Sequence, residues 1–179
     1  MNRRDFMAST AAAGLATAAG PIVHATGGDP EERQAPAVRV QGAIHPVVVA
    51  SANGHTRKNG GARSCVETAY EKMMAGEDVL DALVAGVTIV ELDPEDSSVG
   101  YGGLPNADGV VQLDASVMHG PKKRAGGVGA LEGVKTAAAV AQAVMDRTDH
   151  HLIVGKDAQT FARNMGFPIE ADLNSDRSR

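Results

Sequence analysis

The stretch that most restricts how this chain can fold is SVGYGGLPNADGVVQLDASVMHG, residues 98–120. Four glycines, a proline and an asparagine crowd its first half, and these residue types favour turns. The alternating pattern from Val110 to Met118 then predicts a strand. Glycine allows positive φ angles and close approach between backbone segments. The stretch therefore predicts a tight loop, packed close to another part of the molecule, that leads directly into a strand.

The composition limits both the core and the partners. The chain has 179 residues, which is enough for one domain with a hydrophobic core. Aromatic residues make up only 3% and tryptophan is absent, so the core must consist of Ala, Val, Leu, Ile and Met. The net charge of −5 argues against a nucleic-acid partner, because phosphate binding requires a basic surface.

The first 25 residues have the pattern of an export signal. Arg3 and Arg4 precede an alanine-rich stretch, and a small-residue cleavage site ends at Ala25. This order resembles a twin-arginine signal and predicts a periplasmic or secreted protein; the stretch is too short and too alanine-rich to span a membrane. Residues 26–43 are rich in Gly, Pro and charge, which predicts a flexible linker. Thr26, which cleavage would expose, is followed by a turn-rich sequence and is not expected to serve as a nucleophile.

Hydrophobic periodicity and turn residues predict strands and helices along the rest of the chain. A continuous β-branched run at 46–51 and a second apolar run at 150–155 both indicate buried strands. Helix caps are indicated at Asp78, as a start, and at Gly76 and Gly166, as ends. The expected strands are 46–51, 110–118, 125–131 and 150–155, and the expected helices are 62–74, 78–92, 134–147 and 157–164. This order predicts a layered α/β or α+β fold.

Most familiar catalytic motifs are absent from the sequence. The glycines of the 98–120 stretch precede a strand instead of a helix, which does not fit a dinucleotide-binding loop. His150 and His151 are adjacent, so on a strand they would point to opposite faces, and no metal or other cofactor is expected. Ser98, Asp114 and His119 could form a catalytic triad, but only geometry can decide that.

Two long segments resemble the glycosylasparaginase family of N-terminal-nucleophile amidohydrolases. They are DPEDSSVGYGGLPNADGVVQLDASVMHG and AAAVAQAVMDRTDHHLIVGKDAQTFARNMGF, and they occur in the family's order. The resemblance runs from about residue 46 to 179. It implies an α+β fold, the four-layer αββα sandwich with two antiparallel sheets. It also implies cleavage of the side-chain amide of glycosylated asparagine by a threonine that self-cleavage of a precursor makes N-terminal.

The family's nucleophile lies in a His-Asp-Thr sequence, and this chain contains none. The resemblance therefore implies that residues 44–179 are only the N-terminal (alpha) part of the hydrolase domain, so that the sandwich is incomplete. We expect no catalytic residue in this chain, a threonine nucleophile beyond Arg179, and no activity of the chain alone. The implied partners are the missing C-terminal (beta) part, a small-molecule amide substrate and a second alpha–beta unit in a homodimer.

The resemblance also implies substrate-binding residues in two loops. Ser98 is the candidate for a hydroxyl that faces the nucleophile, and Gly100 lies in the same loop. After the first expected strand the family often has Ser-Thr-Trp-x-Phe, whereas this chain has Ser51, Asn53 and His55 without the aromatics. Losing the aromatics removes a stacking surface for a sugar. An L-asparaginase, an isoaspartyl-peptide hydrolase and a non-catalytic exported binding module therefore stay open as alternatives.

Overall fold

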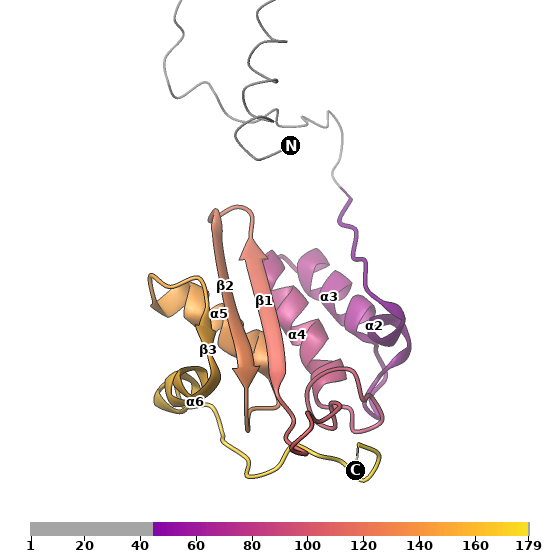
Figure 1. Ribbon diagram of the computed structural model, residues 1–179. Helices are drawn as coiled ribbons and strands as arrows, with labels where there is room; N and C mark the ends of the chain where they lie inside the picture. Colours follow the sequence, from indigo (N-terminus) through magenta and orange to yellow (C-terminus); the bar gives the residue numbers. More distant parts are fainter. Residues whose placement is uncertain (1–44, 179) are drawn as a thin grey trace, which may run out of the picture. The chain divides into compact units, whose positions relative to one another are not determined.

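The computed structural model describes residues 45–178, which belong to the second of two compact units, Ile44–Arg179. The expected signal peptide, the linker and Thr26 lie outside the described residues. The elements follow one another as α2 (Ala52–Thr56), α3 (Cys65–Met74), α4 (Val79–Glu91), β1 (Leu113–His119), β2 (Arg124–Leu131), α5 (Ala137–Arg147), β3 (Ile153–Val154) and α6 (Gly155–Asn164) (Figure 1). No helix within 45–178 is both long and apolar enough to cross a bilayer.

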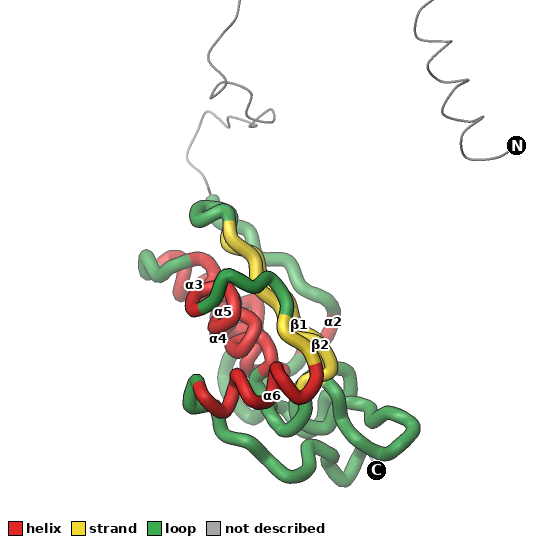
Figure 2. Tube along the Cα trace, turned by 60° about the vertical axis from the view of Figure 1, so that its left-hand side comes forward, coloured by secondary structure: helices red, strands yellow, loops and turns green. Residues whose placement is uncertain are grey.

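The three strands form one sheet in the order β1-β2-β3. β1 and β2 are an antiparallel hairpin, and β2 pairs with β3 in parallel. The helices gather on one side of this sheet, as Figure 2 shows. The main core lies between the sheet and helices α5 and α6, and consists of Val111, Leu113, Val128, Leu131, Val134, Ala137, Val140, Ala141, Val144, Ala158, Ala162 and Leu173. The molecule is thus a mixed α and β fold, with the helices on one side of a small sheet.

Small residues let α5 approach the sheet closely. A Cβ atom added to Gly126 of β2 would lie 2.4 Å from the carbonyl oxygen of Ala141 on α5. No side chain fits in that space, so a glycine is required where the helix crosses the strand. The glycine-rich sequence of β2 therefore serves helix packing, in line with the prediction of a strand at 125–131.

Local sequence signals correctly predicted the starts of two helices. Ser64 and Glu67 form a capping box at the start of α3, in which each side chain accepts a hydrogen bond from the other residue's backbone N–H. Asp78 caps α4 by accepting hydrogen bonds from the N–H groups of Leu80 and Asp81. The expected α4 stripe was partly wrong, because Val79 and Val87 are exposed while Leu80, Ala82 and Val84 are buried.

The prediction of a buried strand at 46–51 was wrong. Residues 45–50 have no regular secondary structure, and the side chains of Val47 and Val49 are 79% and 86% exposed. A strand needs a neighbour for its backbone hydrogen bonds, and within residues 45–178 none lies beside this segment. The expected loop after it instead forms the short helix α2.

The strand at 150–155 is also shorter and less buried than expected. Only Ile153 and Val154 pair with β2, and Leu152 and Val154 are exposed. On β1 the side chains of Asp114, Ser116 and Met118 alternate with the core residues and are exposed as well. One face of the sheet is therefore covered by helices while the other carries exposed apolar side chains.

Candidate active-site loop and groove

The structure brings Ser51, Asn53 and Ser98 together in one hydrogen-bond chain. The hydroxyl of Ser51 donates to the side-chain oxygen of Asn53. The Nδ2 of Asn53 donates to Oγ of Ser98 over 3.0 Å. The Ser98 hydroxyl donates onward to Oδ1 of Asp96 over 2.5 Å. Residues from two loops about 45 positions apart thus meet through directed polar contacts, and we call these four residues the Ser98 network.

Asp96 anchors the Ser98 network and was missed in the sequence analysis. It is buried, and its Oδ1 also accepts the backbone N–H of Ser98 over 2.8 Å. Burial opposes ionisation of Asp96, but hydrogen bonds from Ser98 and Asn53 and the charge of Arg57 outweigh it, so the pKa of this carboxyl lies below its usual value. The Arg57 Nε lies 3.7 Å from Oδ2. An aspartate two residues before a serine is a local turn signal that could have revealed this contact.

The other two expected site residues are placed differently. Gly100 is buried, with φ of 61°, and a Cβ atom there would lie 2.1 Å from the carbonyl oxygen of Glu91. The next residue, Tyr101, donates its N–H to that same oxygen over 2.7 Å. Only glycine can occupy this position, so the loop is held against the end of α4. His55 is exposed on α2, and within the described residues no hydrogen bond joins it to the Ser98 network.

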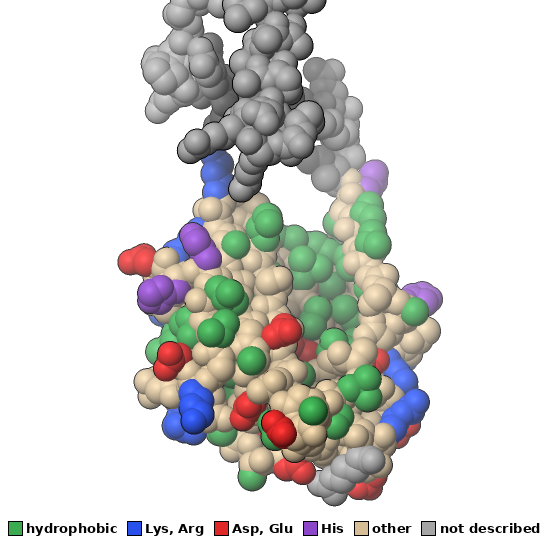
Figure 3. All heavy atoms as spheres, in the orientation of Figure 1, with side chains coloured by type: hydrophobic (Ala, Val, Ile, Leu, Met, Phe, Trp, Pro, Cys, Tyr) green, Lys and Arg blue, Asp and Glu red, His purple; other side chains and the backbone are tan. Residues whose placement is uncertain are grey.

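A groove of about 570 Å³ runs between α4 and β1, and we call it the α4–β1 groove. Its walls are the apolar side chains Leu80, Leu83, Val84 and Val87 of α4, the length of β1, and the Ser98–Gly100 turn. Figure 3 shows a hollow with a largely hydrophobic floor beside the β hairpin. Since Ser98 and Gly100 line its end, the groove connects the candidate site with the free edge of the sheet.

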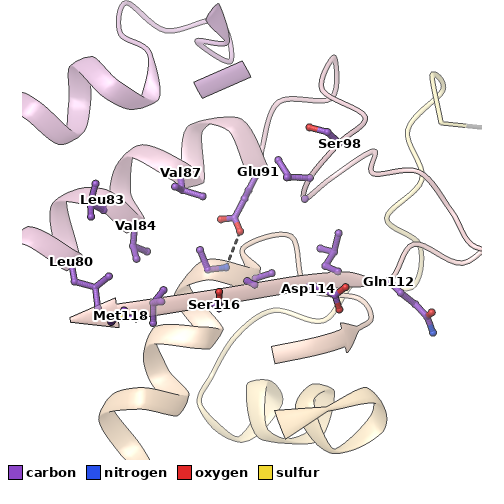
Figure 4. Close-up of a pocket in the computed structure, with 17 residues that line it drawn as sticks. Leu80, Leu83, Val84, Val87, Glu91, Ser98, Gln112, Asp114, Ser116 and Met118 are labelled. Atoms are coloured by element: carbon purple, nitrogen blue, oxygen red, sulfur yellow. Dashed lines mark hydrogen bonds between the residues drawn. The ribbon is translucent and has the colours of Figure 1, made fainter. Parts of the chain in front are cut away.

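Glu91 is a buried acid in the wall of this groove, and it too was missed in the sequence analysis. Its residue is only 3% exposed, and Figure 4 shows its side chain pointing from the end of α4 towards β1. Oε1 accepts the backbone N–H of Ala138 in the first turn of α5 over 2.8 Å, while Oε2 has no hydrogen-bond partner among the described residues. Burial raises the pKa of Glu91 to about 7, although hydrogen bonds from the N–H groups of Ala138 and Ala137 oppose that shift.

The triad interpretation is wrong. His119 lies at the far end of β1, and its Nε2 is 2.8 Å from Oδ2 of Asp78, the cap of α4. Its Nδ1 accepts the backbone N–H of Lys122, so both ring nitrogens serve structure. Asp114 accepts the N–H of Ala130 instead of facing His119. Within residues 45–178, no group of three or more His, Cys, Asp or Glu side chains has the arrangement of a metal site.

With this geometry in place, the sequence was compared with known proteins. A family model described as Asparaginase matches residues 35–178. The chain belongs to this asparaginase family. The resemblance to glycosylasparaginases is thereby confirmed, and relatives of that name are among the matches.

Three relatives illustrate the range of the asparaginase family. A protein of Elizabethkingia miricola named N(4)-(beta-N-acetylglucosaminyl)-L-asparaginase is 35% identical over 178 residues, which are 99% of this chain and 48% of the relative. The Mus musculus protein of the same name is 38% identical over 65% of this chain and 34% of its own length. An isoaspartyl peptidase/L-asparaginase of Rattus norvegicus is 39% identical over 55% and 29%. The chain thus spans about half the length, or less, of these relatives.

Proposed function

We propose that the complete protein is an amidohydrolase that cleaves the side-chain amide of glycosylated asparagine and releases aspartate, and that this chain is the alpha part without the nucleophile. The observation that carries the proposal is the Ser98 network, which places a buried acid, an amide and two hydroxyls at the glycine-rich loop of an asparaginase-family chain. Such a site offers polar contacts for an amide substrate without a cofactor.

In the proposed reaction a threonine from the missing beta part supplies the nucleophile. Its α-amine takes the hydroxyl proton while the oxygen attacks the amide carbonyl carbon. The C–N bond then breaks, the amine departs with the proton, and water hydrolyses the resulting ester to aspartate and free threonine. The role we propose for Ser98 is to orient the threonine hydroxyl or the substrate, because Asp96 fixes the direction of the Ser98 hydroxyl proton. Ser51, Asn53, His55 and Gly100 are proposed as further substrate-binding residues.

The proposal also concerns the assembly. The uncovered sheet face and the free edge of β1 are the surfaces that a second sheet and further strands would cover in a four-layer αββα sandwich. We place these additional elements in the C-terminal beta part, and two alpha–beta units would form the homodimer. Export by the twin-arginine signal to the periplasm or beyond completes the proposal.

The substrate has a second candidate. Ser51, Asn53 and His55 stand where aromatic residues would stack on a sugar, and one relative is named an isoaspartyl peptidase/L-asparaginase. A smaller substrate, such as asparagine itself or a β-aspartyl peptide, fits this loss of stacking surface. Assays with glycosylated asparagine, asparagine and an isoaspartyl dipeptide would rank the candidates.

A single-chain chimera tests the proposed function. The chain would be joined to the part of the Elizabethkingia miricola protein that lies outside the match, and aspartate release would be measured. We expect turnover by the chimera and none by the chain alone. Replacing the nucleophilic threonine with alanine should abolish turnover and is the control. A soluble chimera without activity towards all three substrates would contradict the proposal and favour a non-catalytic exported binding module.

A further inference from the structure

The edge of the sheet at β1 is open along the α4–β1 groove. β1 is the outer strand in the order β1-β2-β3, so only one of its edges is paired with a strand within residues 45–178. A free edge presents unpaired backbone N–H and C=O groups to an incoming strand. An extended segment that adds there would gain main-chain hydrogen bonds and could place alternate side chains on the apolar wall of α4. The groove thus has the two features that strand addition requires.

Glu91 adds a specific polar requirement to this apolar groove. Its Oε2 is buried and unpartnered, whereas Oε1 is already engaged by the N–H of Ala138. A buried acceptor without a donor is costly, and a carboxylate more so than a neutral group. Thr136, the N-cap of α5, makes no side-chain capping bond, so Glu91 also provides the capping acceptor for that helix. The side chain is therefore held in place with one oxygen directed to the groove wall and no donor to satisfy it.

The charge of the groove indicates which donor would fit. Among the described residues that line it, the titratable side chains are Glu91 and Asp114, and both are acids. Asp114 already accepts a hydrogen bond from the N–H of Ala130. A basic side chain on the added segment would satisfy Oε2 and compensate the charge that burial disfavours. The relatives extend over more than twice the length matched by this chain, which provides a source for such a segment.

We propose that the α4–β1 groove is a docking site for one extended segment of the missing beta part, and that Glu91 selects this segment by accepting a hydrogen bond from one of its basic side chains. The inference rests on the proposed function, because it takes the beta part as the partner. Glu91 is then a positioning residue: its backbone oxygen holds Tyr101 and its carboxyl holds α5, so a segment that binds it is placed next to the Ser98 network.

A two-chain binding experiment tests the docking site separately from catalysis. The unmatched part of the Elizabethkingia miricola protein would be expressed as a separate polypeptide, and its capture by the tagged chain would be measured without any substrate. We expect capture by the unaltered chain and roughly tenfold weaker capture by Glu91→Gln, since the amide retains the bond to Ala138 but gives up the charge. The matched control is Glu77→Gln, which lies on the surface outside the groove.

Two further measurements keep the result interpretable. Val87→Glu places a charge at an exposed position in the groove wall, and should weaken capture even if Glu91→Gln fails to fold. NMR of the Glu91 carboxyl should show its pKa falling by about one unit or more when the second chain binds, which a purely structural role would not produce. Equal capture by both groove variants, or no capture by the unaltered chain, would overturn the docking site. The single-chain chimera could still be active in either case, so the two proposals fail separately.

Discussion

The two sides of the sheet differ in how completely they are packed. Where α5 and α6 cover β2, the residues Leu131, Val140, Val144 and Ala158 are fully buried and belong to one core. Around the α4–β1 groove, apolar side chains remain partly exposed, a carboxyl oxygen lacks a partner, and β1 has a free edge. The difference teaches that the first region is complete within this chain, whereas the second has the surfaces of an interior without its occupant.

Truncating one side chain in each region should produce the largest contrast. Leu131→Ala removes a fully buried side chain, and we expect it to lower the free energy of unfolding by roughly 2–5 kcal/mol. Val87→Ala, at the exposed wall of the groove, should change it by less than about 0.5 kcal/mol. Urea denaturation of the two variants provides the measurement. Similar losses for both would mean that the groove region is packed as tightly as the core.

The pH dependence of stability should sharpen the contrast through Glu91. Its pKa of about 7 in the folded chain exceeds the ordinary value of 4.5, so the folded state binds the proton more tightly. The resulting stability is fully present below pH 4.5 and is lost as the pH rises through 7. In the isolated chain, Glu91→Gln should remove this dependence and be more stable than the parent at pH 8 by roughly 2–3 kcal/mol.

Denaturation at intervals between pH 4.5 and 8 tests that expectation. The Glu77→Gln variant serves again as the control and should retain the parent's slope. If Glu91→Gln and the parent lose stability in parallel over this range, another group is responsible for the pH dependence.

Signals that act within a few residues were the ones that could be read from the sequence. Asp78 caps α4 as predicted, and Gly76 and Gly166 adopt positive φ after helices. The tight approach of Gly100 to another backbone was also expected, although the partner, Glu91, was not. These features were predictable because turn and cap preferences depend on local backbone geometry.

Features that depend on distant partners could not be read in the same way. The run at 46–51 has the composition of a strand, but a strand exists only where another backbone pairs with it. The hydrogen bond from Ala138 to Glu91 joins residues 47 positions apart, and nothing near Glu91 in the sequence indicates it. The convergence of Ser51 and Asn53 with Ser98 was expected from the family resemblance alone, and their role in substrate binding stays a prediction.

Helix caps permit a smaller comparison between the two regions. Ser64→Ala breaks the capping box of α3, and we expect it to cost about 1 kcal/mol of unfolding free energy. Thr136→Ala should cost less than about 0.5 kcal/mol, because this N-cap makes no side-chain bond and Glu91 supplies the acceptor for α5. Thermal unfolding of both variants would show the order, and a larger loss for Thr136→Ala would contradict the capping role of Glu91.

The smallest effect on stability, but a visible one on association, is expected from the exposed valines. Val47 and Val49 are 79% and 86% exposed, so replacing both with lysine removes no packing and should change the free energy of unfolding by less than about 0.5 kcal/mol. Exposed β-branched runs promote edge-to-edge pairing, which charge opposes. Sedimentation velocity should therefore show self-association of residues 44–179 and a shift towards monomer in the double variant. A matched Lys pair at Glu71 and Glu77, on the surface of α3 and the turn after it, should leave association unchanged. A parent chain that is monomeric at all concentrations would show that these valines need no partner.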